Sequence, residues 1–473
     1  MRQADRARRS LLNVASCGAM LLSACAHDVA PTAPPQTLKD LPSWTATDGS
    51  SETSSTSATS ATGTAPTWAQ FFTDPELQDL LSRSLRNNRD LRVAALNVEW
   101  AAAQAAQREA DLWPTVVMGL TGLRQSVAGG KLLSSGSAGV QISGFELDVF
   151  ARLRGLSEAA AAQVLASSEN RRAVQIGLVA AVAAAVVALR IDDEMVQVAQ
   201  QVEASRVDTQ RLVQLRVRQG ASSLLDLRTA DAALDGARAA LAQAQRQRWA
   251  DLHALGILVG EPIPALKVPA TGWLDRVGAV ELTPGLPSEV LTRRPDVRAA
   301  EESLKAAQAN VQAARAALFP KIVLTGTTGT TSAELTNLFK AGTWGWSVAP
   351  QLLQTLWDSG RNQAALSGAK TAREIAVAQY DKAVQTAFRE AADAIVAHTT
   401  WKVQMQSLVR QDQAEQDRLN LSRLKFQHGA LSQLDLLEAQ RAAWSTQVTR
   451  LQAQAQAAQT RIALFKALGG GWH

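Results

Sequence analysis

The sequence has very few of the residues that usually build a catalytic or metal site. Its 473 residues include only two cysteines, Cys17 and Cys25, and both lie within the first 25 positions. The remainder therefore has no thiol for a disulfide, a metal or a nucleophile. The five histidines are scattered, and the patterns H-E-x-x-H, G-x-S-x-G and G-x-x-x-x-G-K do not occur. We therefore expect no enzyme activity, no metal and no cofactor.

Proline and glycine are also scarce, with 15 and 29 copies. Charged residues make up 19% of the chain, and after residue 25 no apolar run approaches the roughly 20 residues that a membrane-spanning helix needs. This composition excludes both a disordered chain and a polytopic helical membrane protein. Alanine and glutamine are plentiful instead. Since alanine is the best helix former, we expect long, closely packed helices.

The chain has little excess positive charge outside its N-terminus. The formal net charge is +5. Residues 1–24 contribute +3 of this charge, from four arginines and one aspartate, which leaves +2 for the rest of the chain. Nucleic-acid binding needs a clustered basic face, so we expect no nucleic-acid partner.

The first 24 residues resemble an export signal. A basic segment over 1–9 precedes a short apolar segment over 11–22, which is typical of a secretory signal peptide. Leu22-Ser23-Ala24-Cys25 then resembles the lipobox of bacterial lipoproteins, whose cysteine is acylated and becomes the mature N-terminus. We therefore predict a lipoprotein signal peptide over 1–24 and lipidation at Cys25. The alternatives are a plain signal peptide with an incidental cysteine, or processing before Cys17.

The residues after Cys25 indicate in which membrane the lipidated cysteine would lie and how it would connect to the rest of the chain. In the lipoproteins that this signal resembles, Asp after the cysteine favours retention at the inner membrane, so Ala26 indicates the outer membrane. The segment 25–67 is rich in Pro, Ser and Thr, and it has too little apolar surface to offset the entropy lost on ordering. We predict that this segment is a tether.

The remainder of the chain contains one architecture twice. An aspartate 24 residues before Pro114 has a counterpart 24 residues before Pro320, and Gly220 has a counterpart 209 residues later at Gly429. An ordered series of shared landmarks indicates an internal two-fold repeat. The predicted parts are a first repeat over 68–260, an inter-repeat equatorial segment over 261–293 and a second repeat over 294–470.

Each repeat is expected to contain a helix, a β-hairpin, a very long helix, a tight turn and a further helix. Pro114 cannot continue a helix and ends the first one, while Gly220 and Gly429 mark the turns after the long helices. The expected elements are a helix over 89–113, strands over 115–124 and 138–149 around a loop that includes 134–136, helices over 152–219 and 221–258, and a second long helix over 362–428.

The strand segments alternate apolar and polar residues. Trp344, Trp346 and Val348, for example, alternate with Gly345 and Ser347. This pattern is typical of a transmembrane barrel strand, and we expect Trp344 and Trp346 to face lipid. Two amphipathic hairpins on a soluble core are the alternative. Because four strands cannot close a barrel and open edges are not tolerated in lipid, a barrel requires an oligomer with eight, twelve or sixteen strands.

The last helix of the second repeat carries an unusual arginine. Apolar residues recur every seven positions along this helix, as in a coiled coil. Arg441 shares a heptad position with Leu434, where an arginine is costly unless it is paired or faces water. Glu438 lies three residues before Arg441, close enough to pair with it on one helix. The pair is either an ordinary exposed contact or part of a functional site.

Three segments resemble a known family. Pro284–Glu301, with the sequence PGLPSEVLTRRPDVRAAE, resembles the outer membrane factor (TolC-like) family. It is closest to the lipoprotein branch that serves resistance-nodulation-division (RND) efflux pumps. Glu146–Arg154 and Leu356–Arg361 resemble the two junctions between strand and helix in that branch. The resemblance covers about 68–470.

The resemblance implies a mainly α-helical protein with a β transmembrane part. In this family a homotrimer forms a twelve-stranded β-barrel in the outer membrane, with four strands per chain, and a long helical coiled-coil tunnel in the periplasm. The tunnel docks a periplasmic adaptor (membrane fusion) protein and an inner-membrane RND pump. We therefore expect the outer membrane channel of a tripartite efflux system, which exports drugs or other small toxic solutes and contributes to antibiotic resistance.

The resemblance also implies a gate at the periplasmic tip of the tunnel. The gate motif of the family falls on Leu434, Glu438 and Arg441. The family usually has Asp where this chain has Glu438, which leaves the closure geometry open.

Two other functions stay open at this point. The same family fold serves as the outer membrane conduit of type I protein secretion systems. A non-conducting, lipid-anchored coiled-coil scaffold would explain the helices and the lipobox, but it would not explain a hairpin in both repeats.

Overall fold

The computed structural model describes residues 67–126, 129, 132–264, 273, 277, 292–334 and 337–470. The chain divides into the units Met1–Asp48 and Gly49–His473, and all described residues belong to the second unit. The predicted signal peptide, the predicted lipidation at Cys25 and the predicted tether, apart from Thr67, lie outside the described residues. So does most of the segment 261–293.

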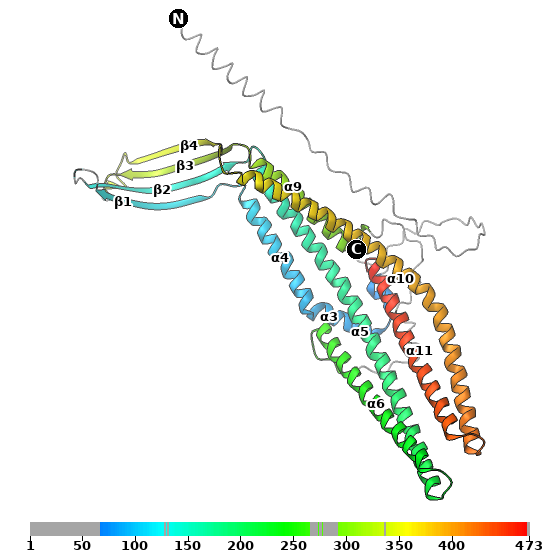
Figure 1. Ribbon diagram of the computed structural model, residues 1–473. Helices are drawn as coiled ribbons and strands as arrows, with labels where there is room; N and C mark the ends of the chain where they lie inside the picture. The colour runs from blue at the N-terminus through cyan, green and yellow to red at the C-terminus, as the bar shows by residue number, and fades with distance from the viewer. Residues whose placement is uncertain are drawn as a thin grey trace, which may run out of the picture. The chain divides into compact units, whose positions relative to one another are not determined.

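Each half of the chain contains a helix, two strands and two further helices in the same order, and the first half begins with two additional helices (Figure 1). The first half contains α2 (Trp68–Phe71), α3 (Pro75–Asn87), α4 (Arg89–Ala110), β1 (Val116–Ser126), β2 (Leu132–Leu147), α5 (Arg152–Arg218) and α6 (Leu224–Val259). The second half contains α9 (Pro295–Ala316), β3 (Lys321–Ser332), β4 (Trp344–Leu353), α10 (Arg361–Gln427) and α11 (Gln433–Ala467).

The expected helices and strands are present, with one correction. The long helices α5 and α10 have 67 residues each, so each spans about 100 Å. The segment 134–136, which we expected in a loop, lies in β2 and pairs with 122–124 of β1. Serine and glycine have low strand propensity, but pairing with a neighbouring strand outweighs that local preference.

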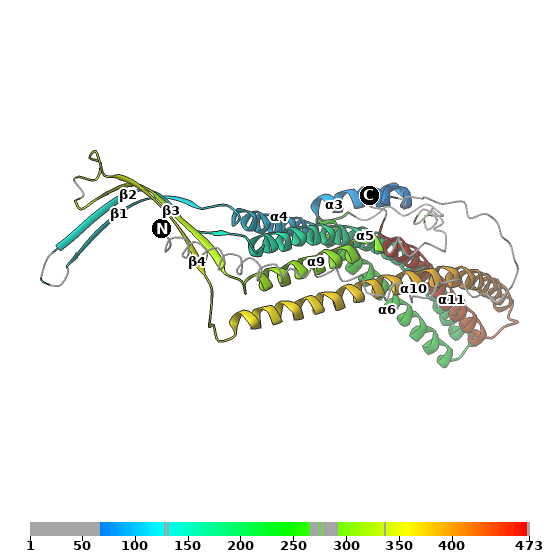
Figure 2. The same ribbon diagram turned by 90° about the horizontal axis from the view of Figure 1, so that it is seen from above.

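The helices form a single layer with two open edges. Next to the sheet, α4 packs against α5, α5 against α9, and α9 against α10. Farther from the sheet, α6 takes the place of α4 and α11 takes the place of α9 (Figures 1 and 2). Both levels of the layer therefore contain four helices, with α4 or α6 at one edge and α10 at the other.

The shorter helices meet end to end. The side-chain amide of Asn88, the N-cap of α4, donates to the carbonyl oxygen of Leu258 near the end of α6 at 2.9 Å. The guanidinium of Arg294, the N-cap of α9, donates to the carbonyl oxygen of Ala467 at the end of α11 at 3.2 Å. Asn88 and Arg294 occupy equivalent places in the two halves, and so do Leu258 and Ala467. Each pair of short helices therefore runs alongside one long helix.

The largest buried cluster lies where α2, α3, α6 and α11 pack on the middle of α5. The rings of Phe71 and Phe72 pack on Phe465 of α11, with centroid distances of 4.6 and 5.4 Å. The expectation that no apolar run after residue 25 approaches the length of a membrane-spanning helix was wrong for the middle of α5. That stretch is long and apolar enough to cross a membrane, but most of it is buried inside the structure. Helix α5 is therefore the central packing element of the helical layer.

Candidate functional site

The four strands form one antiparallel sheet in the order β1-β2-β3-β4, which leaves β1 and β4 at its edges. Every residue of β1 and β4 is exposed. In the described part of the chain, no helix packs on either face of this sheet (Figure 2). A single-layer sheet with open edges buries too little apolar surface to be stable in water. The sheet therefore needs partners for its edges and for at least one face.

The register gives the sheet one apolar face. Directly paired residues on neighbouring strands point to the same side of a sheet. Trp346 pairs with Thr328, Thr328 with Val140, and Val140 with Met118. The face that includes this row, here called the apolar face, carries most of the large apolar side chains of the sheet: Val116, Met118, Leu120, Val140, Ile142, Ile322, Leu324, Trp344, Trp346, Val348 and Leu352.

The opposite side, here called the polar face, carries mainly small, hydroxyl-bearing and amide side chains. The hydroxyl oxygens of Thr121 and Ser137 lie 2.5 Å apart across β1 and β2. Those of Thr327 and Ser347 lie 2.7 Å apart across β3 and β4. An apolar outer face and a polar inner face are the two sides that a transmembrane barrel presents to lipid and to its lumen.

Trp344 and Trp346 lie on the apolar face at the start of β4, and 66% and 69% of their surface is exposed. No other part of the described chain covers them. They are therefore placed as a lipid-facing pair requires, and their contact with lipid stays a prediction.

Charged side chains fix the connection between β2 and α5. Glu146 accepts two hydrogen bonds from Arg152, at 2.8 and 2.7 Å. Asp148 accepts hydrogen bonds from the backbone N–H groups of Leu153 and Arg154 at 2.9 and 2.8 Å. Desolvation would raise the pKa of Asp148, but the hydrogen bonds from Arg154 and Leu153 outweigh it and lower the pKa. The carboxylate therefore stays ionised and caps the first turn of α5.

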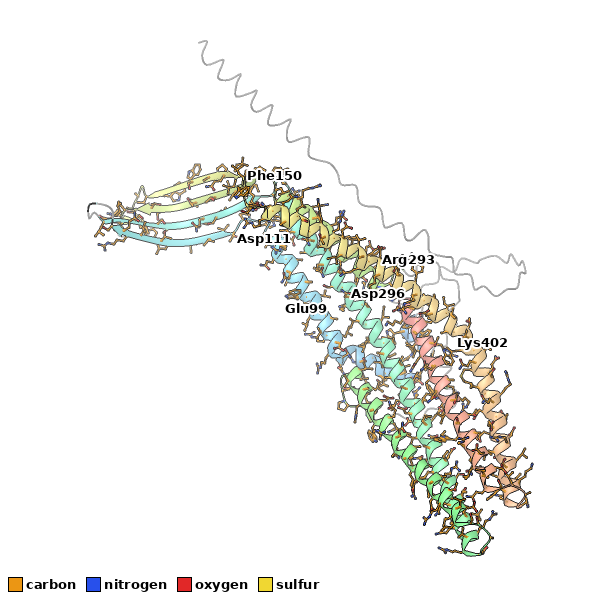
Figure 3. The ribbon with its side chains drawn as sticks, viewed as in Figure 1. Glu99, Asp111, Phe150, Arg293, Asp296 and Lys402 are labelled. Carbon is orange, nitrogen blue, oxygen red and sulfur yellow. The ribbon has the colours of Figure 1, made fainter. Side chains whose placement is uncertain are left out.

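Both long helices begin after a sharp bend at the end of the sheet that lies next to the helices. Ala151 precedes α5 with φ 59°, and Gly360 precedes α10 with φ 85°. Phe150, which Figure 3 labels where the sheet meets the helices, stacks on Phe319 with ring centroids 4.9 Å apart. This stack brings the end of the first hairpin into contact with the start of the second, next to the helices.

Two buried arginines hold the helical layer near its middle. Arg190 of α5 donates to the carboxylate of Asp74 at 2.8 and 3.2 Å. Arg294 donates to Asp296, labelled in Figure 3, and to Glu390 of α10, both at 2.7 Å. Burial would lower the pKa of each arginine, but the carboxylate partners outweigh it and raise the pKa. Both charges are therefore paired inside the layer, where they fix the positions of the helices.

The end of the helical layer farthest from the sheet consists of two tight turns. Gly220 lies in the turn between α5 and α6, and Gly429 lies in the turn between α10 and α11. Both glycines have φ 72°, which a residue with a Cβ rarely adopts. The hydroxyl groups of Ser223 and Ser432 accept hydrogen bonds from the N–H group three residues later, at 3.1 and 3.2 Å. Each turn therefore leads directly into a capped helix.

Leu434, Glu438 and Arg441 lie near this end of α11, at the spacing of one helical face. Arg441 donates to the carboxylate of Glu438 at 2.9 Å. Their side chains are 72% and 54% exposed, and neither has another partner among the described residues. A pair this exposed contributes only about 0–1 kcal/mol to stability. One chain therefore brings the three residues together without shielding them, and their role as a gate stays a prediction.

Comparison with known proteins identifies the family. A model of the outer membrane efflux protein family matches residues 80–261 and 286–470, which together include both hairpins and the helices α4, α5, α6, α9, α10 and α11. The chain belongs to this family.

Two curated relatives have been named as outer membrane proteins, one of them as part of an efflux pump. This chain is 39% identical over 414 residues to the probable efflux pump outer membrane protein TtgC of Pseudomonas putida. The matched region covers 86% of this chain and 85% of the relative. This chain is also 36% identical over 412 residues to the outer membrane protein OprJ of Pseudomonas aeruginosa, and the matched region covers 86% of each chain.

Solved structures of outer membrane channels have the same fold. The open state of the MtrE outer membrane channel of Neisseria gonorrhoeae matches with a TM-score of 0.79 and 39% identity, over 88% of this chain and 94% of that one. The channel protein CusC matches with a TM-score of 0.80 and 33% identity, over 86% of this chain and 94% of that one.

As an outer membrane efflux protein, the chain is a transport component and its family is not one of enzymes. The sheet is its transmembrane part and the helices belong to the periplasmic tunnel. The apolar face of the sheet has the character of a lipid-facing side, and the polar face has the character of a lumen-facing side.

Two features of the site were not predicted from the sequence. Gln440, between Glu438 and Arg441, points the other way and is only 8% exposed. Its side-chain oxygen accepts a hydrogen bond from Arg206 of α5 at 2.5 Å, and burial lowers the pKa of Arg206. Glutamine is so frequent in this chain that no local signal marks Gln440. Only the packing of α11 on α5 distinguishes it from its neighbours.

The second feature is a row of glycines across the polar face. The register aligns one glycine from each strand, namely Gly119, Gly139, Gly329 and Gly345. A Cβ at Gly139 would lie 2.4 Å from the backbone oxygen of Thr328, so β2 and β3 approach closely here. The sequence could have suggested this row only through the correct register of all three strand pairs.

Proposed function

We propose that three copies of this chain form the outer membrane channel of a tripartite RND-type efflux system. The observation that carries the proposal is the sheet, which has one face suited to lipid, one suited to water and two unpaired edges. Three copies would pair β1 of one chain with β4 of the next and close a twelve-stranded barrel without edges. The helical layer, with its edges at α4 or α6 and at α10, would close into a tunnel in the same way.

The proposed cargo is drugs or other small toxic solutes, and the proposed partners are a periplasmic adaptor and an inner-membrane RND pump. This part of the proposal is supported by the relatives, which include an antibiotic efflux pump outer membrane protein, ArpC, and a toluene efflux pump outer membrane protein, TtgC, both from Pseudomonas putida.

Single-channel recording of the purified protein in planar bilayers tests the channel. We expect discrete conductance steps, and we expect none from a variant that lacks the first hairpin, residues 116–147. Folded protein that never conducts would instead support the lipid-anchored scaffold.

The genes beside the coding sequence test the choice of cargo. Genes for an adaptor and an RND pump would support efflux. A neighbouring exporter with its own protein substrate would support the type I secretion conduit. Deleting the chain in a strain that keeps its adaptor and pump should then increase susceptibility to the exported compounds.

We also propose that Cys25 is acylated and anchors the mature chain to outer membrane lipid. The proposal is supported by the Leu22-Ser23-Ala24-Cys25 sequence directly after the apolar segment. Mass spectrometry of the mature N-terminus should find a lipid-modified Cys25, and an unmodified N-terminal peptide that begins elsewhere would refute it.

Finally, we propose that Leu434, Glu438 and Arg441 from three chains converge at the periplasmic tip and gate the tunnel. The exposed position of all three residues in a single chain supports this proposal, because neighbouring copies can then reach them.

A further inference from the structure

Lys321 lies where the sheet joins the helices. It is the first residue of β3 and pairs with Leu353, the last residue of β4. Because side chains alternate along a strand, Lys321 points to the same side as Thr325 and Thr327. That side is the polar face, and Lys321 is exposed on it.

The polar face has almost no other charge. Among the strand residues that the structure describes, only Glu146 also places an ionisable side chain on this face, through its pairing with Val323. Glu146 is held by Arg152 in a two-point ion pair at 2.7 to 2.8 Å, so its charge is compensated. Lys321 has no ion pair within the described part of the chain. One uncompensated positive charge per chain therefore remains at the helix-proximal end of the polar face.

The rest of the polar face is uncharged. It consists mainly of hydroxyl, amide and glycine positions, such as Thr121, Ser137, Gln141 and Gly345. Arg124, the other basic residue of the described strands, belongs to the apolar face because it pairs with Ser134 in the row beyond Gly136. On the polar face of the described strands, charge is therefore concentrated at one level.

We propose that Lys321 sets the charge preference of the barrel, by placing three ammonium groups around the lumen where the barrel meets the tunnel. This ring would favour small anionic solutes, such as carboxylates and phosphates, over cations. The inference rests on the proposed trimeric channel. The ring acts through water over distances close to the Debye length, which is about 10 Å at 0.1 M salt and about 3 Å at 1 M.

Reversal potentials in planar bilayers under a KCl gradient test the inference. We expect Lys321→Gln to lower the chloride-to-potassium permeability ratio about twofold at 0.1 M salt, and Lys321→Glu to lower it further. Both effects should shrink at 1 M KCl. Arg124→Gln is the matched control, because it removes the same charge from the lipid side of the same sheet, and it should leave the ratio unchanged.

A second measurement separates a charge effect from a folding effect. Lys321→Cys can be modified after assembly, since the chain has no cysteine beyond Cys25. An anionic methanethiosulfonate should lower the permeability ratio of the conducting channel, and a cationic one should restore it. Conducting channels with equal ratios in the wild type, Lys321→Gln and Lys321→Glu would overturn the inference and leave the proposed channel intact. A wild-type protein that never conducts would overturn both.

Discussion

At the scale of single residues, a carboxyl pair lies between α5 and α6. Burial, followed by the hydrogen bond and the charge of Asp251, raises the pKa of Asp192 to about 7. The cation beside them, Arg248, is bound to Asp193 instead. One carboxyl oxygen of Asp192 is buried without a hydrogen-bond partner in the described structure. The folded protein therefore keeps a proton on Asp192 at pH values where the unfolded chain has lost it.

This pair predicts a pH-dependent stability. Because the folded pKa lies above the ordinary value of 3.8, stability should fall as the pH rises from about 4 to about 7 and level off above that. Asp192→Asn, which stays neutral, should flatten this dependence and stabilise the protein at pH 8 by on the order of 2–4 kcal/mol. Thermal unfolding of the protein in detergent between pH 5 and 8 measures both effects.

The exposed carboxylate of Asp235 on α6 provides the control for this experiment. Asp235→Asn should keep the pH dependence of the wild type. An equally steep dependence in Asp192→Asn would show that another group titrates.

The gate hypothesis also belongs to the residue scale. If three Glu438–Arg441 pairs converge at the tip, the charge-assisted hydrogen bonds among them contribute about 1.5–3 kcal/mol each when they are shielded from water. Arg441→Ala would leave three carboxylates that repel one another, so the tip should loosen. We expect higher single-channel conductance and greater entry of bulky antibiotics such as vancomycin. Glu438→Gln should act in the same direction but more weakly.

Arg228 supplies a matched control at the other turn. It forms a pair with Asp231, at 3.3 Å and three residues away on α6, and Arg228 is as exposed as Arg441, although Asp231 is less exposed than Glu438. Arg228→Ala should change the conductance little. Unchanged conductance in Arg441→Ala, at normal trimer levels, would mean that Glu438 and Arg441 are an ordinary surface pair.

At the scale of elements, the glycine row controls how β2 and β3 pair. A Cβ at Gly329 would lie 2.2 Å from the backbone oxygen of Ala138, and one at Gly139 would lie 2.4 Å from Thr328. Gly139→Val should therefore push the two strands apart and cost about 1–3 kcal/mol. We expect a lower yield of heat-resistant trimers on gels of unheated samples.

Gly326, on the interior strand β3, supplies the control for this experiment. A Cβ at Gly326 would meet nothing nearer than the backbone oxygen of Ser347 at 3.9 Å, which is an ordinary contact distance. Gly326→Val should therefore assemble as the wild type does. Equal trimer yields from Gly139→Val and Gly326→Val would show that β2 and β3 tolerate wider spacing.

At the scale of the whole molecule, the open edges predict which strands meet between chains. Thr121 lies on β1 and Ser347 on β4, at opposite edges of one sheet. Two strands separate them, and with neighbouring strands about 4.8 Å apart no disulfide can join them within one chain. Thr121→Cys combined with Ser347→Cys, treated with a short bifunctional thiol reagent, should therefore give covalent dimers and trimers on denaturing gels.

Each single cysteine variant is the control for this cross-linking. With one thiol per chain on the sheet, the three-chain product should not form. Only monomers from the double variant would contradict the proposed contact between β1 and β4.

Local features of the sequence were sufficient for the helices and strands of the two repeats, but α2 and α3 were not predicted. Pro114 and Pro320 end helices by removing a backbone donor, and glycines form the turns at 220 and 429 because those turns need a left-handed residue. These effects act over a few residues, so they appear in one repeat as clearly as in the other. The prediction of a loop over 134–136 was wrong, because this segment pairs with β1 as a strand. Strand formation depends on the pairing partner as well as on the residues of the segment itself.

The sequence by itself therefore determined the order of helices and strands, the internal repeat and the alternation that marks the hairpins, since each follows from local backbone chemistry and periodicity. Only the tertiary structure decided the register of the sheet, and with it the side on which Lys321 and the glycine row lie. It also decided which polar residues became buried partners, such as Gln440 with Arg206 and Asp192 with Asp251. Those partners come from segments far apart in the chain, and their energies depend on distance and burial, which no local pattern encodes.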